Sequence, residues 1–312
     1  MAIDADRSTT TVRGLDFLVI GAAKSGTTTL FHYLDGHPGL FMPANKEAPF
    51  FTKDEVYQRG WDAYAGEYFG NASVSLLWGK ITPRYLGDVA VPARLASAMP
   101  DVSLIALLRN PIDRAFSKYR LMVRGGRESR TFSQLVDDQL SADALEHARS
   151  QPGPIRDSVV VRGEYARQLD RYFEYFPRSH FLVLLTDDLE RTPEMVVDSV
   201  LSFIGTEPGF RPANLGSRYY VGGDEQRFPG LIPAVQRLPG AQALWRRIPG
   251  DRRRATAMWF SRQANVKRRQ PPPFPAEVRA RLADFYRPDV ARLESILGRA
   301  VPWPDFTDGS AG

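Results

Sequence analysis

The sequence FLVIGAAKSGTTTL, residues 17–30, decides the fold of this chain. An apolar run from Phe17 to Ile20 enters a loop that begins at Gly21 and closes at Gly26. Consecutive apolar residues followed by glycine are typical of a buried parallel strand, and the threonines after Gly26 predict a helix over Thr27 to Leu34. Because free N–H groups at a helix N-terminus bind anions, this unit predicts a phosphate site.

The position of the lysine identifies the type of phosphate loop. A nucleotide triphosphatase loop reads G-x-x-x-x-G-K-[ST], whereas here Thr27 follows the second glycine and the lysine lies inside the loop, at Lys24. The tract resembles the 5′-phosphosulfate loop of sulfotransferases that use 3′-phosphoadenosine 5′-phosphosulfate (PAPS). The resemblance implies that Lys24 stabilises the leaving phosphate oxygen. It also implies donor contacts from Ser25, Gly26, Thr27, Thr28 and Thr29.

A second strand-to-helix junction supports the same resemblance. The apolar run Ser103 to Leu108 leads to Arg109, and Ser117 follows eight residues later, in a helix predicted to continue to Arg124. In the sulfotransferase family an arginine and a serine at this spacing hold the 3′-phosphate of the donor, which implies that role for Arg109 and Ser117. A guanidinium offers phosphate a planar fork, and the hydroxyl adds a neutral donor.

Composition fits one enzyme-sized unit. The 312 residues are 43% hydrophobic, with a formal net charge of +5 and no cysteine. This length is enough to bury a substantial core, and the lack of cysteine excludes disulfides and thiolate chemistry. The positive balance suits anionic ligands, although an arginine-rich composition gives the same balance without any ligand.

No metal, nucleic-acid or membrane partner is expected. Four scattered histidines offer no metal spacing, and none of the usual nucleic-acid-binding motifs occurs. The first residues lack the apolar core of a signal peptide, and no run of about 18 apolar residues is present. We therefore expect a cytoplasmic protein, in the compartment where PAPS is made.

Strands and helices alternate as in a parallel sheet wrapped by helices. The expected fold class is α/β, a P-loop-like sulfotransferase fold with a central parallel sheet flanked by helices. We expect a flexible tail over residues 1–15, a single domain over 16–304 and a C-terminal tail over 305–312. A long stretch before the last helix predicts an inserted lid at about 222–265.

The spacing of apolar residues, together with glycine and proline at segment ends, predicts the remaining helices, strands and loops. A loop is expected over 37–51 and a third strand over 181–185, and Thr192 is the expected cap of the helix that follows that strand. Helices are expected over residues 57–78, 92–99, 132–148, 165–176, 193–204 and 275–286.

The resemblance narrows to the heparan sulfate sulfotransferase-like branch, which acts on sugar hydroxyls or amines. In that branch a Lys-Gly-Arg loop before the last helix closes over the donor phosphates. Lys267, Arg268 and Arg269 stand there, with arginine in place of glycine. The branch also has an upstream tyrosine that contacts the nucleotide, and the candidate is Tyr220. Motifs from Phe17 to Trp303 carry this resemblance, so it covers nearly the whole chain.

The same branch implies a catalytic base. In a K-E-x-H-F-F type motif its glutamate removes the acceptor proton, and here the matching position is Glu47. A base is needed because the acceptor hydroxyl loses its proton during an in-line transfer, in which positioning and charge stabilisation dominate. Asp54 is the reserve candidate.

Two positions depart from the branch. Pro49 stands where relatives have a histidine, and Lys80 stands where the Gly-Glu-x-Thr-Pro motif has an acid. Both positions line the acceptor side in relatives, so they bear on the acceptor more than on the donor. Lys80 either pairs with an anionic acceptor or, more simply, faces solvent.

These observations predict a sulfotransferase that moves a sulfuryl group from PAPS to a hydroxyl, less readily an amine, of a carbohydrate or small natural product. The product is adenosine 3′,5′-bisphosphate (PAP), and no metal is required. Two alternatives stay open. A nucleotide phosphotransferase is disfavoured by the place of Lys24 and by the lack of an evident magnesium-binding aspartate. A catalytically impaired nucleotide- or glycan-binding protein is suggested by Pro49 and Lys80. The oligomeric state is unknown.

Overall fold

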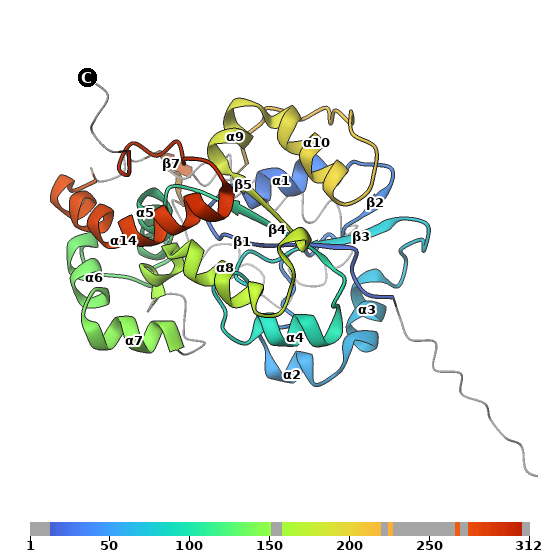
Figure 1. The fold of residues 1–312 in the computed structure, drawn as a ribbon, viewed down its shortest axis with the longest axis horizontal. Helices are drawn as coiled ribbons and strands as arrows, with labels where there is room; N and C mark the ends of the chain where they lie inside the picture. The colour runs from blue at the N-terminus through green and yellow to red at the C-terminus, as the bar shows by residue number, and fades with distance from the viewer. Residues whose placement is uncertain (1–12, 151–157, 220–223, 227–265, 269–273, 308–312) are drawn as a thin grey trace, which may run out of the picture.

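A five-stranded parallel sheet organises the chain (Figure 1). The computed structural model describes residues 13–150, 158–219, 224–226, 266–268 and 274–307. Every neighbouring pair of strands in the sheet is parallel. In spatial order the strands are β2 (Leu40–Phe41), β3 (Leu77–Ile81), β1 (Phe17–Gly21), β4 (Ser103–Leu108) and β5 (Phe181–Leu185). The expected α/β fold with a central parallel sheet is confirmed.

The central strand β1 is buried on both faces, because its side chains alternate between two cores. Phe17 and Val19 belong to the core under α1 (Thr27–Leu34), α9 (Thr186–Arg191) and α10 (Pro193–Phe203). Leu18 and Ile20 belong to the larger core on the other face. That core also contains residues of α3 (Trp61–Phe69), α4 (Val91–Ala98), α5 (Pro111–Arg124), α6 (Phe132–Gln139), α8 (Tyr165–Phe173) and α14 (Ala276–Leu297).

Two of the predicted helices are wrong in extent. Within the region 57–78 the main helix is α3. The short α2 (Asp54–Tyr57) ends before α3 begins, and Gly60, with a φ of 83°, separates the two helices. At the other end of the region, Trp78 already lies in β3. The region 132–148 is divided between α6 and α7 (Ala142–Ser150). At the division Ser141 Oγ donates to Asp138 O at 3.0 Å, a local bond that competes with helix continuation.

The last helix is longer than predicted, and one cap differs. Helix α14 continues past Tyr286 and through Pro288, because Val290 and Leu293 beyond the proline are buried in the larger core. It ends at Gly298, which adopts the left-handed conformation. Thr192 does not cap α10 with its side chain. Its hydroxyl donates instead to Asp188 O, within the α9 turn.

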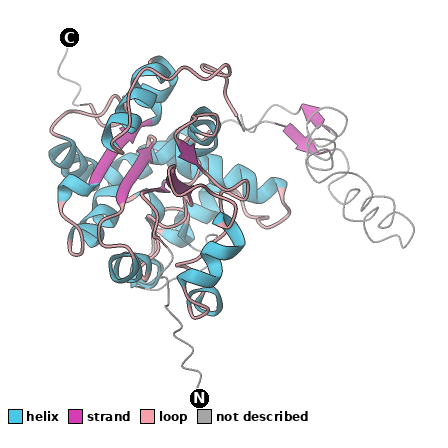
Figure 2. Ribbon diagram, turned by 90° about the vertical axis from the view of Figure 1, so that its right-hand side faces the viewer, coloured by secondary structure: helices cyan, strands magenta, loops and turns pink. Residues whose placement is uncertain are grey.

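Two strands of the sheet and two short helices were not predicted. Strand β2 lies inside the expected loop 37–51, and β3 begins within the helix expected over 57–78. Helix α2 precedes that region, and α9 follows β5 directly. A separate antiparallel ribbon pairs β6 (Asp224–Gln226) with β7 (Val266–Arg268), as Figure 2 shows. The rest of the predicted lid at 222–265 lies outside the described residues. In the part of the chain that is described, no helix combines the length and apolar character needed to cross a membrane.

We predict that Gly79→Ala destabilises the sheet by about 1–3 kcal/mol through overpacking. Gly79 pairs with Phe17 across β3 and β1, and a β-carbon at position 79 would come within 1.9 Å of Phe17 Cζ. The Phe17 ring is fully buried and has no space to retreat. Urea unfolding measures the change.

The matched control is Gly66→Ala, in the interior of α3. An added β-carbon there meets no atom within 4 Å, so removing a flexible glycine from a helix is expected to stabilise the protein by about 0.5–1 kcal/mol. Equal stabilities of Gly79→Ala and the wild type would contradict the packing argument.

Candidate active site

The loop between β1 and α1 presents a helix N-terminus to the C-terminal edge of the sheet. Gly26, at the N-cap of α1, adopts the left-handed conformation at a φ of 89°, and no side chain caps the helix there. Lys24 also has a positive φ, 78°, which is uncommon for a residue with a side chain. The first-turn N–H groups of α1 are therefore available to an anion, as in other helix-terminus sites.

The second predicted junction has a similar form. Asn110 N-caps α5, since its side-chain oxygen accepts from the N–H groups of Ile112 at 2.9 Å and Asp113 at 3.4 Å. The buried Tyr165 donates its hydroxyl to Arg109 O at 2.8 Å. The backbone at Arg109 and directly after it is thereby fixed.

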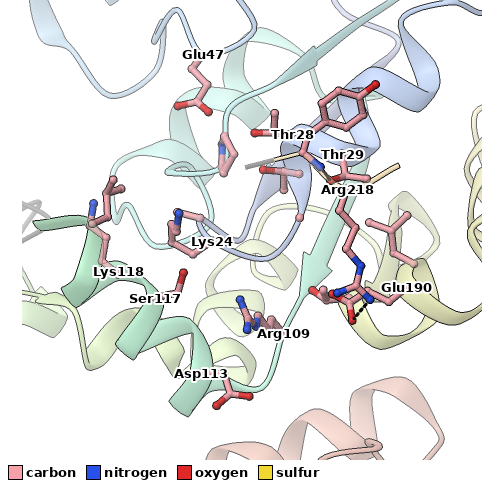
Figure 3. A pocket seen from close by; sticks show the side chains of 18 of the residues that line it. Lys24, Thr28, Thr29, Glu47, Arg109, Asp113, Ser117, Lys118, Glu190 and Arg218 are labelled. Carbon is pink, nitrogen blue, oxygen red and sulfur yellow. Dashed lines mark hydrogen bonds and ion pairs between the residues drawn. The ribbon is translucent and has the colours of Figure 1, made fainter. Parts of the chain in front are cut away.

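One pocket of about 740 Å³ collects these residues at the carboxyl ends of the strands, the usual ligand edge of a parallel sheet. Figure 3 shows Lys24, Arg109 and Ser117 pointing into the same space, with Glu47 across from them. The predicted residues that line this pocket are Lys24, Gly26, Thr27, Thr28, Thr29, Glu47, Arg109 and Ser117.

Among the other predicted site residues only Ser25 has a described side chain, and it does not line the pocket. Ser25 is fully buried, and its carbonyl accepts from Thr186 Oγ1 at 2.8 Å. Lys267 and Arg268 belong to β7, of which only the backbone is described. Tyr220 and Arg269 lie outside the described residues.

Tyr219, the neighbour of the predicted tyrosine, lines the pocket. Its N–H donates to Thr29 Oγ1 at 3.2 Å, and its ring centroid lies 4.0 Å from that of His32. Asn214 Nδ2 donates both to Tyr219 Oη at 2.9 Å and to His32 O at 3.0 Å. This segment is thus held against α1, and the sequence-based prediction named Tyr220 and missed Tyr219.

The pocket wall carries more cations than acids. Burial, and then the charges of Arg124, Arg109 and Arg120, lower the pKa of Lys24. The acids in the wall are Glu47, Asp113 and Glu190, against Lys24, Lys46, Arg84, Arg109, Lys118, Arg120 and Arg218. An anion bound among these groups would relieve their mutual repulsion.

Lys118 shows the same effect beside Ser117. Burial, followed by the charges of Arg127, Arg162 and Lys24, lowers its pKa to about 8. Sequence reasoning missed Lys118, although its place directly after the predicted phosphate-binding serine was a signal.

Glu47 stands on a loop whose backbone is anchored by four side chains from other elements. Lys80 Nζ donates to Asn45 O at 3.3 Å, and Tyr64 Oη donates to Ala48 O at 2.7 Å. Tyr85 Oη accepts from the N–H groups of residues 50 and 51 at 2.8 and 3.2 Å, and Arg94 donates to the carbonyl of residue 51 at 2.9 Å. These four contacts fix the loop backbone from which the Glu47 side chain extends.

The Glu47 side chain is accessible, 48% exposed, and pairs with Lys46 Nζ. Asp54, the reserve base, is 72% exposed, pairs with Arg94 at 2.5 Å and does not line the pocket. Of the two candidates the structure therefore brings only Glu47 to the pocket.

Lys80 does not face solvent, so the simpler of the two expectations for this residue is wrong. It is 2% exposed, because its neighbour across the sheet is Leu18, a member of the larger core. Its ammonium lies 5.4 and 5.3 Å from the ring centres of Tyr64 and Tyr68. Burial lowers the pKa of Lys80 to about 7, opposed by the charge of Glu47 and assisted by that of Lys46.

Comparison with known proteins identifies the family to which the chain belongs. The model of the sulfotransferase domain matches residues 15–212, more than half of the chain. The chain belongs to the sulfotransferase domain family. The matched range contains the phosphate loop, Glu47, Arg109 and Ser117, and the resemblance inferred from those motifs is confirmed.

Several curated relatives of this sulfotransferase are named as enzymes that act on heparan sulfate. Bifunctional heparan sulfate N-deacetylase/N-sulfotransferase 3 of Homo sapiens is 31% identical over 202 residues, 62% of this chain and 22% of that protein. Heparan sulfate glucosamine 3-O-sulfotransferase 6 of Homo sapiens is 28% identical over 289 residues, 92% of this chain and 72% of that protein. The chain therefore spans about a fifth of the bifunctional relatives and most of the 3-O-sulfotransferase.

A solved structure agrees with the fold of this sulfotransferase over almost its whole length. The sulfotransferase from Alicyclobacillus acidocaldarius superposes with a TM-score of 0.66 and 26% identity, covering 93% of this chain and 98% of that one. Within the described ranges of the present chain, no group of three or more His, Asp or Glu side chains is arranged to hold a metal ion.

We predict that Lys80→Met removes a pH dependence of stability. Between pH 7 and the ordinary lysine value of 10.5, the unfolded chain keeps a proton that folded Lys80 has released, so the free energy of unfolding rises with pH. From pH 7 to 9 the wild-type sulfotransferase is expected to gain about 2 kcal/mol relative to Lys80→Met. Urea unfolding at both pH values measures this gain.

The control is Lys53→Met, an exposed lysine that precedes α2. The groups that face Lys80 are Glu47, Lys46, Tyr64 and Tyr68, and all of them remain in both variants. Parallel pH profiles for Lys80→Met and the wild type would show that Lys80 is protonated normally and would contradict its burial.

Proposed function

We propose that this protein transfers a sulfuryl group from PAPS to a hydroxyl, less readily an amine, of a carbohydrate or small natural product and releases PAP. One observation carries the proposal: Lys24 with its threonine-lined helix N-terminus and Arg109 with Ser117 line one pocket, opposite a carboxylate. Two phosphate sites side by side match a donor that has both a 5′-phosphosulfate and a 3′-phosphate. A nucleoside triphosphate has no 3′-phosphate for the second site.

On the donor side, the amides and hydroxyls of residues 27–29 bind the 5′-phosphate. Lys24 stabilises the charge that develops on the leaving phosphate oxygen, and its lowered pKa indicates an ammonium that gains from a nearby anion. Arg109 and Ser117 bind the 3′-phosphate. Contacts to the nucleotide from Tyr220, Lys267, Arg268 and Arg269 remain predictions, and Tyr219 is added to them.

On the acceptor side, Glu47 removes the proton from the attacking hydroxyl. Glu47 and Lys24 line the same pocket from opposite sides (Figure 3). An acceptor bound between them would have the base on one side and the donor on the other, as an in-line transfer requires. The carboxylate needs no covalent step, because a loose transition state depends mainly on alignment and charge stabilisation.

The acceptor class follows from the relatives and from the charge of the wall. The named relatives modify heparan sulfate at nitrogen in one case and at oxygen in the other, so both acceptor groups are represented. Arg84, Lys118 and Arg120 line the pocket as well, which favours a carbohydrate that carries anionic groups. The cytoplasmic location expected from the sequence stays a prediction.

We predict that PAP binds without magnesium and that Arg109→Ala weakens binding about 10- to 100-fold, since hydrogen bonds to charged groups contribute about 1.5–3 kcal/mol. Isothermal titration calorimetry with and without Mg²⁺ tests both points, with ATP as competitor. The control is Arg59→Ala, an exposed arginine that pairs with Glu67 on the outside of α3. A preference for Mg-ATP, or unchanged affinity in Arg109→Ala, would return the phosphotransferase alternative to first place.

We predict that Glu47→Gln lowers kcat by about 10²- to 10⁴-fold, the usual contribution of a general base, and leaves PAP affinity unchanged. The assay follows transfer of ³⁵S from labelled PAPS to a panel of oligosaccharides that begins with heparan sulfate, and NMR of the product separates O- from N-sulfation. Glu67→Gln, on the exposed side of α3, is the control.

Full activity of Glu47→Gln would exclude Glu47 as the base. If the wild type bound PAP tightly but sulfated no member of the panel, the impaired nucleotide- or glycan-binding alternative would be favoured instead.

A further inference from the structure

One acidic side chain stands in the part of the wall proposed to hold the 3′-phosphate. Asp113 lines the pocket together with Arg109 and Ser117 (Figure 3). Asp113 and Ser117 are four residues apart in α5, so they lie one turn apart on the same helix face. An uncompensated carboxylate at this place would repel a phosphate group.

Arg279, in the first turn of α14, pairs with that carboxylate. Its Nη1 lies 2.9 Å from Asp113 Oδ1. Its Nε and Nη2 each donate at 2.7 Å to an oxygen of Asp305, which also accepts from Asn110 Nδ2 at 2.7 Å. The side chain of Asp305 is 12% exposed and that of Asp113 is 37% exposed. Asp305 therefore fixes the orientation of the guanidinium through Nε and Nη2, and in this orientation the third nitrogen, Nη1, points to Asp113.

Aromatic packing fixes the point from which Arg279 reaches α5. Phe274, just before α14, has ring-centroid distances of 4.5 Å to Phe116 and 5.3 Å to Phe132. The Arg279 guanidinium lies 5.3 Å from the centre of the Phe274 ring. The start of α14 is thus packed on α5, with the guanidinium between an aromatic face and two carboxylates.

We propose that Arg279 is a positioning residue for the sulfuryl donor. By pairing with Asp113, it removes net negative charge from the wall between Arg109 and Ser117, so that the 3′-phosphate of the donor can bind there. The inference rests on the proposed function. Without Arg279, Asp113 would face the phosphate without its direct ion-pair partner.

The test compares PAP with adenosine 5′-monophosphate, which lacks the 3′-phosphate, by calorimetric titration. In Arg279→Met, PAP affinity is expected to fall about tenfold, equivalent to about 1.4 kcal/mol, whereas the affinity for the monophosphate stays unchanged. The matched control is Arg292→Met. Arg292 lies on the same helix and makes a two-contact pair with Asp170, at 2.5 and 2.9 Å, whose residues do not line the pocket.

A second substitution separates charge from structure. Asp113→Asn in the Arg279→Met background removes the uncompensated carboxylate, so PAP affinity is expected to return to within about twofold of the wild type. If Arg279 served only to attach α14 to α5, this second change would restore nothing, because it adds no contact between the two helices.

Three outcomes would overturn the proposal: unchanged PAP affinity in Arg279→Met, equal weakening for PAP and the monophosphate, or no recovery in the double variant. If wild-type protein failed to bind PAP, the donor assignment would fail and this inference with it. Normal PAP binding by the wild type combined with any of the three outcomes would overturn the role of Arg279 alone.

Discussion

The parallel pairing of β1 with β4 is the constraint on which the site depends. Both strands are apolar and buried on two faces, so they pair in the centre of the sheet and their carboxyl ends meet at one edge. Ala22 N donates to Leu107 O at 2.8 Å, which continues the pairing into the phosphate loop. Thr186, directly after β5, donates to Ser25 O and lies 2.9 Å from Leu108 O. Three chain segments are thereby joined beneath the pocket.

This edge concentrates like charges, and the rest of the fold holds them in place. The lowered pKa values of Lys24 and Lys118 reflect burial and neighbouring cations, so an anion bound at this wall would relieve the repulsion among them. Rigid backbone makes this arrangement possible. Asn110 caps α5 and contacts Asp305, which in turn orients Arg279.

The proposed acceptor side is built differently from the proposed donor side. The residues proposed to bind the donor follow strand ends and helix N-termini, whereas Glu47 lies on a loop whose backbone depends on side chains of β3, α3 and α4 and on Tyr85. Lys80 is one of these anchors.

The sequence by itself determined three of the five strands (β1, β4 and β5), the phosphate-loop motif and the Arg109–Ser117 spacing, because each is a local pattern: an apolar run, then glycine or arginine, then a helix start. It did not determine the burial of Lys80 or the continuation of α14 past Pro288. It also did not reveal the meeting of Arg279 with Asp113. Each of these depends on packing between residues far apart in the chain. Local patterns state what a segment can form, and only tertiary contacts decide which charges are buried and which partners meet.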